Sequence, residues 1–138
     1  MIVVVIIGLL AAMSIPAFER ARSNTYASRI ANNMRVFSGA FETHALDNGT
    51  WAPDGQGNQL PATVQPYLAD TAWYEEPIPG GWYDWEYDRA GFKAAISLAY
   101  ERDFPEVFLK VDAMLDDGNF TTGSFVKKNG RYFYVLEP

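Results

Sequence analysis

The first eighteen residues of the chain, MIVVVIIGLLAAMSIPAF, contain no charged side chain. A helix of this length would measure about 27 Å, close to the roughly 30 Å of a bilayer's hydrocarbon core. The sequence becomes polar directly afterwards, with Glu19, Arg20 and Arg22. A small soluble domain has no need of a terminal helix that is apolar on every side, so we expect something outside the domain to cover this segment.

Three arrangements would cover such a segment: a secretory signal peptide, a single-span anchor, and a helix that later packs against copies of itself. Secretory signal peptides carry a basic region before a shorter apolar core and a small-residue cleavage site after it. No basic residue precedes the apolar run here, and the helical pattern continues beyond it. The signal peptide is therefore the least favoured of the three.

The segment MIVVVIIGLLAAMSIPAFERAR resembles the N-terminal helix of type IV pilins and of type II secretion pseudopilins. The similarity lies in the β-branched run at residues 2–7, the small residues after it, and Ile15-Pro16 before an arginine-containing continuation. It implies a structural, non-enzymatic subunit of a homomeric or mixed filament. The helix would anchor the chain in the inner membrane, with the head in the periplasm, and later pack in the core of a periplasmic or extracellular filament. The residues expected to pack there are Ile2, Val5, Gly8, Leu9, Ala12 and Pro16.

Members of this family begin with a basic leader and a glycine, followed by an aromatic residue that becomes the methylated mature terminus and then by a glutamate. None of these residues precedes Met1 in the sequence. We therefore expect the natural chain to start further upstream. The chain as printed is expected to lack the processing site and the glutamate, which in the family pairs with a neighbour's terminal amine. The resemblance does not separate pilus from pseudopilus, or major from minor subunits.

Helical periodicity continues into the polar part of the chain. The apolar residues that share one helix face are Ile30, Met34, Phe37 and Phe41. We expect polar residues such as Arg29 and Asn33 to lie on other faces. The helix is predicted to reach about Leu46, because Asp47-Asn48-Gly49 supplies residues suited to a left-handed helix end. We therefore divide the chain into a long helix at residues 1–48, whose stem is 1–18, and a globular head at 49–138.

The head is predicted to have an α+β fold. Alternating apolar residues predict strands, Gly- and Pro-rich stretches predict loops at 49–66 and 73–81, and the sequence FPEVFLKVDAML predicts a helix. The strongest local signal is Asn129-Gly130 between two apolar runs, which predicts a β-hairpin. The predicted strands are 82–87, 92–100, 123–126 and 131–136. We expect them to form an antiparallel sheet of about four strands against the C-terminal half of the long helix.

Charge is unevenly distributed between the two parts. Residues 49–138 contain seven Lys and Arg against fourteen Asp and Glu, whereas residues 1–48 contain four against three. An acidic head disfavours nucleic acid as a partner. The chain has twenty-one aromatic residues and no cysteine. Most aromatics are expected in the core, but the group between Trp51 and Tyr87 leaves an alternative open: a membrane-anchored binding module with a Trp/Tyr-rich recognition head.

Residues that carry chemistry are few. The single histidine, His44, is expected to be packed or exposed rather than a metal ligand, and no nucleotide-binding or catalytic motif is present. Asp84, Glu86 and Asp88 alternate along one predicted strand, and we expect this to be its solvated face. A second acidic group offers oxygen ligands to calcium, an ion that major pseudopilins bind near their C-terminal end. Its members are Asp112, Asp116, Asp117 and Asn119. No other cofactor is expected.

Overall fold

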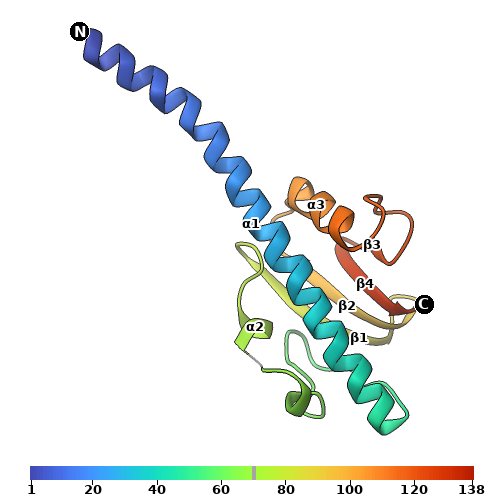
Figure 1. Ribbon diagram of the computed structural model, residues 1–138. Helices are drawn as coiled ribbons and strands as arrows, with labels where there is room; N and C mark the ends of the chain where they lie inside the picture. The colour runs from blue at the N-terminus through green and yellow to red at the C-terminus, as the bar shows by residue number, and fades with distance from the viewer. Residues whose placement is uncertain (70) are drawn as a thin grey trace.

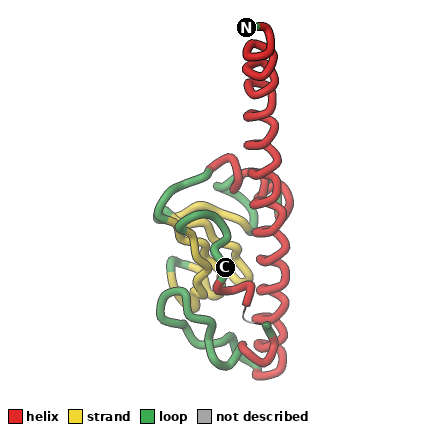
Figure 2. Tube along the Cα trace, turned by 90° about the vertical axis from the view of Figure 1, so that its left-hand side faces the viewer, coloured by secondary structure: helices red, strands yellow, loops and turns green. Residues whose placement is uncertain are grey.

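The computed structural model describes residues 1–69 and 71–138. The long helix α1 (Ile2–Asn48) runs the length of the molecule, and its first part projects alone from a head built on a four-stranded antiparallel sheet (Figure 1). Figure 2, a view from the side, shows the second half of α1 lying along the head. The α+β architecture, with a free stem and a sheet packed on the C-terminal half of the helix, is confirmed.

The helix α1 ends where the sequence predicts. Gly49 adopts the left-handed conformation, with φ 74°, and its N–H donates to the Ala45 carbonyl at 2.8 Å. This is the C-terminal arrangement that glycine adopts at no steric cost. Pro16 lies inside the helix, which continues on both sides of it. The loss of one backbone hydrogen bond at Pro16 therefore does not end the helix in this chain.

One face of α1 forms the spine of the core. The predicted face residues Ile30, Met34, Phe37 and Phe41 are all fully buried. Phe41 stacks on Trp85 with 3.8 Å between ring centroids. The prediction for Asn33 was wrong, because Asn33 is buried and its side-chain amide donates to the Tyr83 hydroxyl at 3.2 Å. A hydrogen bond to a residue fifty positions away has no local sequence signature.

The sheet follows the predicted hairpins. Its strands are β1 (Gly81–Arg89), β2 (Phe92–Tyr100), β3 (Phe125–Lys128) and β4 (Arg131–Glu137), in the order β1-β2-β4-β3. Asn129 and Gly130 both have positive φ, 50° and 75°, as a two-residue hairpin turn requires. β3 begins two residues later than predicted. All neighbouring strands are antiparallel.

The described part of the head contains three further helical segments. They are the 3₁₀ turn η1 (Gln65–Tyr67), the short helix α2 (Thr71–Tyr74) and the helix α3 (Pro105–Leu115). α2 corrects the prediction that the segment from Trp73 onward is loop. Trp73 is fully buried and contacts Phe37 edge-on at 5.0 Å. The Pro and Gly residues that follow in this segment predict a loop, but the burial of Trp73 holds its first residues in a helical turn.

α3 covers the β3–β4 side of the sheet. Its buried residues are Val107, Phe108, Val111 and Asp112, whereas Leu109 is half-exposed. Phe108 stacks on Tyr132 with 3.9 Å between ring centroids. The core therefore lies between the sheet on one side and α1 with α3 on the other.

Candidate functional site

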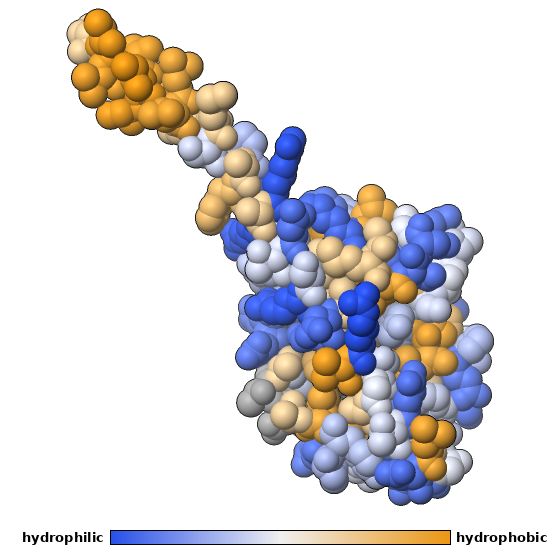
Figure 3. Space-filling view, in the orientation of Figure 1, coloured by the Kyte–Doolittle hydropathy of each residue, from blue (hydrophilic) through white to orange (hydrophobic). Residues whose placement is uncertain are grey.

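Among residues 1–69 and 71–138, none packs against the stem. All of the residues predicted to pack in a filament, Ile2, Val5, Gly8, Leu9, Ala12 and Pro16, are exposed. Figure 3 shows the outer part of the stem as an apolar surface, whereas the visible face of the head is a mixture of hydrophilic and apolar patches. By length and composition this part of α1 is able to cross a membrane, and none of its eighteen-residue apolar window is buried.

Gly8 stands out within the stem. A Cβ atom placed on Gly8 would meet no heavy atom within 4 Å. Glycine inside a helix costs about 1 kcal/mol relative to alanine. In the part of the chain that the structure describes, no packing contact at Gly8 offsets that cost.

The acidic residues at the end of α3 come together as predicted. Ligand oxygens of Asp112, Asp116 and Asp117 all lie within 4.8 Å of one another. Asp112 is fully buried, and its Oδ1 accepts from the Gly118 N–H at 3.3 Å. Its Oδ2 is also buried and has no hydrogen-bond partner among the residues that the structure describes. Burial raises the pKa of Asp112, and the neighbouring carboxylates of Asp117 and Asp116 act in the same direction.

Other side-chain oxygens of this cluster accept hydrogen bonds within the loop that follows α3. Asp116 Oδ2 accepts from the backbone N–H groups of Ser124 and Phe125. Asp117 accepts from the Asn119 N–H at 2.8 Å and, through its other oxygen, from the Thr122 hydroxyl at 2.6 Å. The predicted ligand Asn119 turns its own side-chain oxygen to Thr121. The carboxylates thus order the loop, and only Asp112 retains a free buried oxygen.

The acidic residues of β1 correct a prediction. Asp84 and Glu86 do not form a solvated face: both are buried, and Arg131 of β4 bridges them at 3.1 and 3.0 Å. The Ser97 hydroxyl also donates to Glu86 at 2.9 Å. Burial, reinforced by the Glu86 charge, raises the pKa of Asp84 to about 6. Asp88 alone of the three residues is exposed.

Most of the clustered aromatics belong to the core. Trp73, Tyr83 and Trp85 are fully buried. Trp51 and Tyr87 are instead only partly buried and line a cleft of about 530 Å³ at the end of the head farthest from the stem, together with Glu42, Lys93 and Glu137. Sequence analysis missed this cleft, since its residues come from α1, the following loop and three strands.

His44 is buried near the end of α1. Its ring lies edge-on to Tyr67 with 5.8 Å between centroids, and its Nδ1 has no hydrogen-bond partner within residues 1–69 and 71–138. The expectation that His44 is either packed or exposed resolves in favour of packing.

No family model, curated protein or solved structure matches this chain.

Proposed function

We propose that this protein is a structural subunit of a type IV pilus or type II secretion pseudopilus-like filament. Its stem would hold it in the inner membrane, with the head in the periplasm, until assembly, and would then pack against the stems of other subunits in a periplasmic or extracellular filament. The role is structural and involves no catalysed reaction. The observation that carries the proposal is the exposed apolar stem, which is continuous with the helix that forms the spine of the head.

The exposed stem is energetically unfavourable in water. Eleven large apolar side chains between Ile2 and Phe18 are exposed by 50% or more. Covering a side chain of this type contributes about 1.5–3 kcal/mol when its burial is complete. The stem therefore gains on the order of 10–20 kcal/mol from a lipid environment or from neighbouring helices. Lipid and neighbouring helices would both bury these side chains, so burial alone does not distinguish a membrane anchor from a filament helix.

Gly8 favours the filament over a plain anchor. Small residues let helix backbones approach closely, and helix association in the absence of water depends on that approach. Ala11 and Ala12 extend the small surface next to Gly8. A helix that only needed to cross lipid would gain more from a larger side chain at each of these positions.

The substitution Gly8→Leu separates the two hypotheses. It keeps the stem apolar, so the protein should remain in the membrane fraction at its normal level, while filaments counted by electron microscopy should fall on the order of tenfold. Ile7→Leu is the matched control, because it conserves side-chain volume and should leave filament number unchanged. Normal filament density in Gly8→Leu would refute the packing argument.

A second candidate function is a membrane-anchored binding module that never polymerises. The distal cleft between Trp51 and Tyr87 favours it, because partly exposed aromatic rings beside Glu42 and Glu137 offer both stacking and hydrogen-bonding groups to a ligand. Such a module would keep its function in Gly8→Leu. If Gly8→Leu retains full ligand binding and no filaments are seen, the binding module is favoured.

Calcium fits the acidic cluster at the end of α3. The Asp112, Asp116 and Asp117 carboxylates would hold the ion, and the unpartnered Asp112 Oδ2 is a buried oxygen of the kind that calcium prefers. The ion would neutralise the mutual repulsion of three carboxylates and so stabilise the loop that joins α3 to β3. Asn119 would join the site only by giving up its bonds to Thr121.

A further inference from the structure

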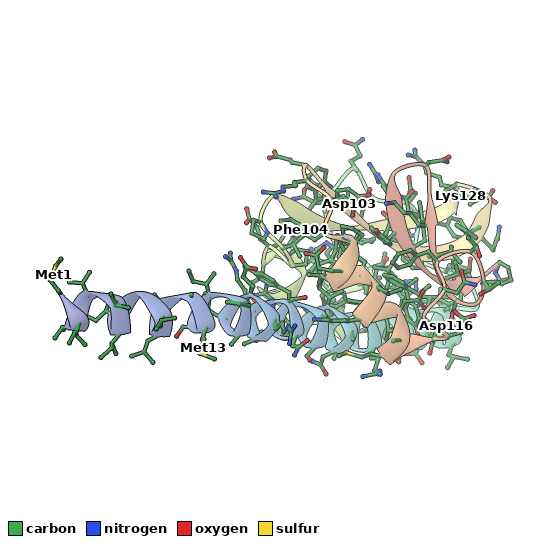
Figure 4. The ribbon with its side chains drawn as sticks, turned by 90° about the horizontal axis from the view of Figure 1, so that it is seen from above. Met1, Met13, Asp103, Phe104, Asp116 and Lys128 are labelled. Atoms are coloured by element: carbon green, nitrogen blue, oxygen red, sulfur yellow. The ribbon has the colours of Figure 1, made fainter. Side chains whose placement is uncertain are left out.

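A groove lies where the stem meets the head. It has a volume of about 790 Å³, and residues 16–26 of α1 form one wall while the segment around Phe104 and the start of α3 form the other. Figure 4 shows Phe104 at the end of the head nearer the stem and Asp116 farther along the head. The groove is therefore at the opposite end of α3 from the acidic cluster.

The groove lies at the depth of the lipid headgroups if the stem spans a bilayer. The uncharged segment ends at Phe18, and Arg20 and Arg22 lie two and four residues beyond it. At the rise of an α-helix these positions are about 3 and 6 Å past Phe18 along the helix axis. The headgroup layer on each side of a bilayer is roughly 5–8 Å thick. Pro16, in the apolar segment itself, also lines the groove, so the cavity adjoins the hydrocarbon boundary.

The groove is basic although the protein is acidic. The chain carries a net charge of −6. Four cations line the groove, against the two carboxylates of Glu19 and Glu106. The cations are Arg20, Arg22, Arg102 and Lys110. An anionic headgroup is attracted to such a site and repelled by the rest of the head.

Neutral groups, rather than carboxylates, hold three of these cations in place. Lys110 Nζ donates to the Ser23 hydroxyl at 3.0 Å and to Asn24 Oδ1 at 2.7 Å. The Arg22 guanidinium donates to the Tyr26 hydroxyl at 3.0 Å, and the Arg102 guanidinium lies 5.4 Å from the Phe104 ring centroid. Each contact positions a cation without neutralising it.

Most cations elsewhere in residues 49–138 are paired with an acid. Arg89, Lys93, Lys127 and Arg131 all lie within 4 Å of a carboxylate, whereas Lys128 lies over the Phe92 ring. Among residues 1–69 and 71–138, no ion pair involves any of the four groove cations. Their charge is therefore available to an anion from outside the chain.

We propose that this groove binds the headgroup of an anionic phospholipid and so docks the head against the bilayer surface. The lipid phosphate would contact Lys110 and Arg102 from the head and Arg22 from the stem, and its acyl chains would lie along the stem. The inference rests on the membrane-anchoring part of the proposed function and is independent of filament assembly.

The test compares the full chain in nanodiscs of zwitterionic phosphatidylcholine with discs that also contain phosphatidylglycerol, by amide hydrogen exchange. Exchange across residues 19–26 and 102–110 should be about fivefold slower in the anionic discs. The double variant Arg102→Gln/Lys110→Gln should lose this difference. Arg89→Gln, which removes a head cation outside the groove, should keep it. Unchanged exchange in the core strand β2 would show that each variant is folded.

Two results would overturn the inference in different ways. If the chain floats with both kinds of disc but residues 19–26 and 102–110 exchange at the same rate in each, the headgroup site is wrong and membrane anchoring stands. The same conclusion follows if the double variant retains the difference between the discs. If the chain does not float with discs of either composition, membrane anchoring itself fails, and the headgroup site fails with it.

Discussion

The unpartnered oxygen of Asp112 leads to a prediction about stability and calcium. Asp112 is fully buried, and only its Oδ1 accepts a hydrogen bond. A buried acceptor without a partner costs about 1–3 kcal/mol. Two further carboxylates within 4.8 Å add repulsion. At an effective dielectric constant of 20, two unit charges 4.8 Å apart repel each other by about 3.5 kcal/mol, and solvent screening at the exposed Asp117 lowers this repulsion.

Asp112→Asn should therefore stabilise the protein when calcium is absent. The substitution removes the buried charge, and its amide can donate to the adjacent carboxylates. We expect a gain of about 1–3 kcal/mol in the free energy of unfolding at pH 7. For a head of this size that gain raises the melting temperature by roughly 4–20 °C. The assay is thermal unfolding of the full chain in detergent with chelator, followed by near-ultraviolet circular dichroism.

Calcium should stabilise the original protein but not the variant. It should raise the melting temperature of the original protein and leave Asp112→Asn unchanged, because the ion compensates the charge that the variant lacks. Asp117→Asn is the matched control for the chelator experiment. Both Asp117 oxygens already accept hydrogen bonds, so this variant should not be stabilised.

Three results would refute this reasoning. Destabilisation of Asp112→Asn in chelator would mean that the Asp112 carboxylate makes a net favourable contact. An equal calcium effect in both proteins would place the ion elsewhere. An unchanged melting temperature of the original protein would remove calcium from the proposal.

Two further predictions concern other parts of the head. Because the pKa of Asp84 is raised to about 6, protonated Asp84 contributes stability that is full below pH 4 and is lost as the pH rises through 6. The free energy of unfolding should therefore fall by on the order of 1–3 kcal/mol between pH 4 and pH 7, and denaturant titrations of Asp84→Asn should show a flatter profile. Gly123 has φ 77°, and a Cβ atom there would overlap the Asp116 carboxylate, so Gly123→Ala should lower the free energy of unfolding by about 1–3 kcal/mol. A change below 0.5 kcal/mol, the usual range of neutral surface substitutions, would show that the loop accommodates the methyl group.

The local elements were predictable because each carries its own signal. The apolar face of α1 repeats at the helical period, Gly49 ends the helix, and Asn129-Gly130 makes the turn between β3 and β4. The acidic triad at the end of α3 was also predictable, since its members are close in sequence. These features depend on neighbours within a few residues, which is the range over which a pattern in one sequence carries information.

The failures at Asn33, at Asp84 with Glu86, and at the groove between stem and head involve partners that are distant in the sequence. Alternation correctly places Asp84 and Glu86 on the same face of β1, but it does not reveal that Arg131 of β4 bridges them. The small residues Ala95 and Ser97 of the intervening strand β2 leave room for that contact across the sheet. The junction groove was missed for the same reason, because one of its walls belongs to the stem and the other to the head.

The distribution of charge fits both environments proposed for the stem, the bilayer and the filament. In the bilayer, the cations that follow Phe18 would lie among headgroup phosphates. In a filament, the stem would be surrounded by other subunits, and the same cations would leave that layer together with the stem. The head, with seven basic and fourteen acidic residues at 49–138, offers carboxylates to a neighbour's junction. On leaving the membrane, the cations that follow Phe18 would therefore exchange lipid phosphates for carboxylates of a neighbouring head, and so would keep anionic partners.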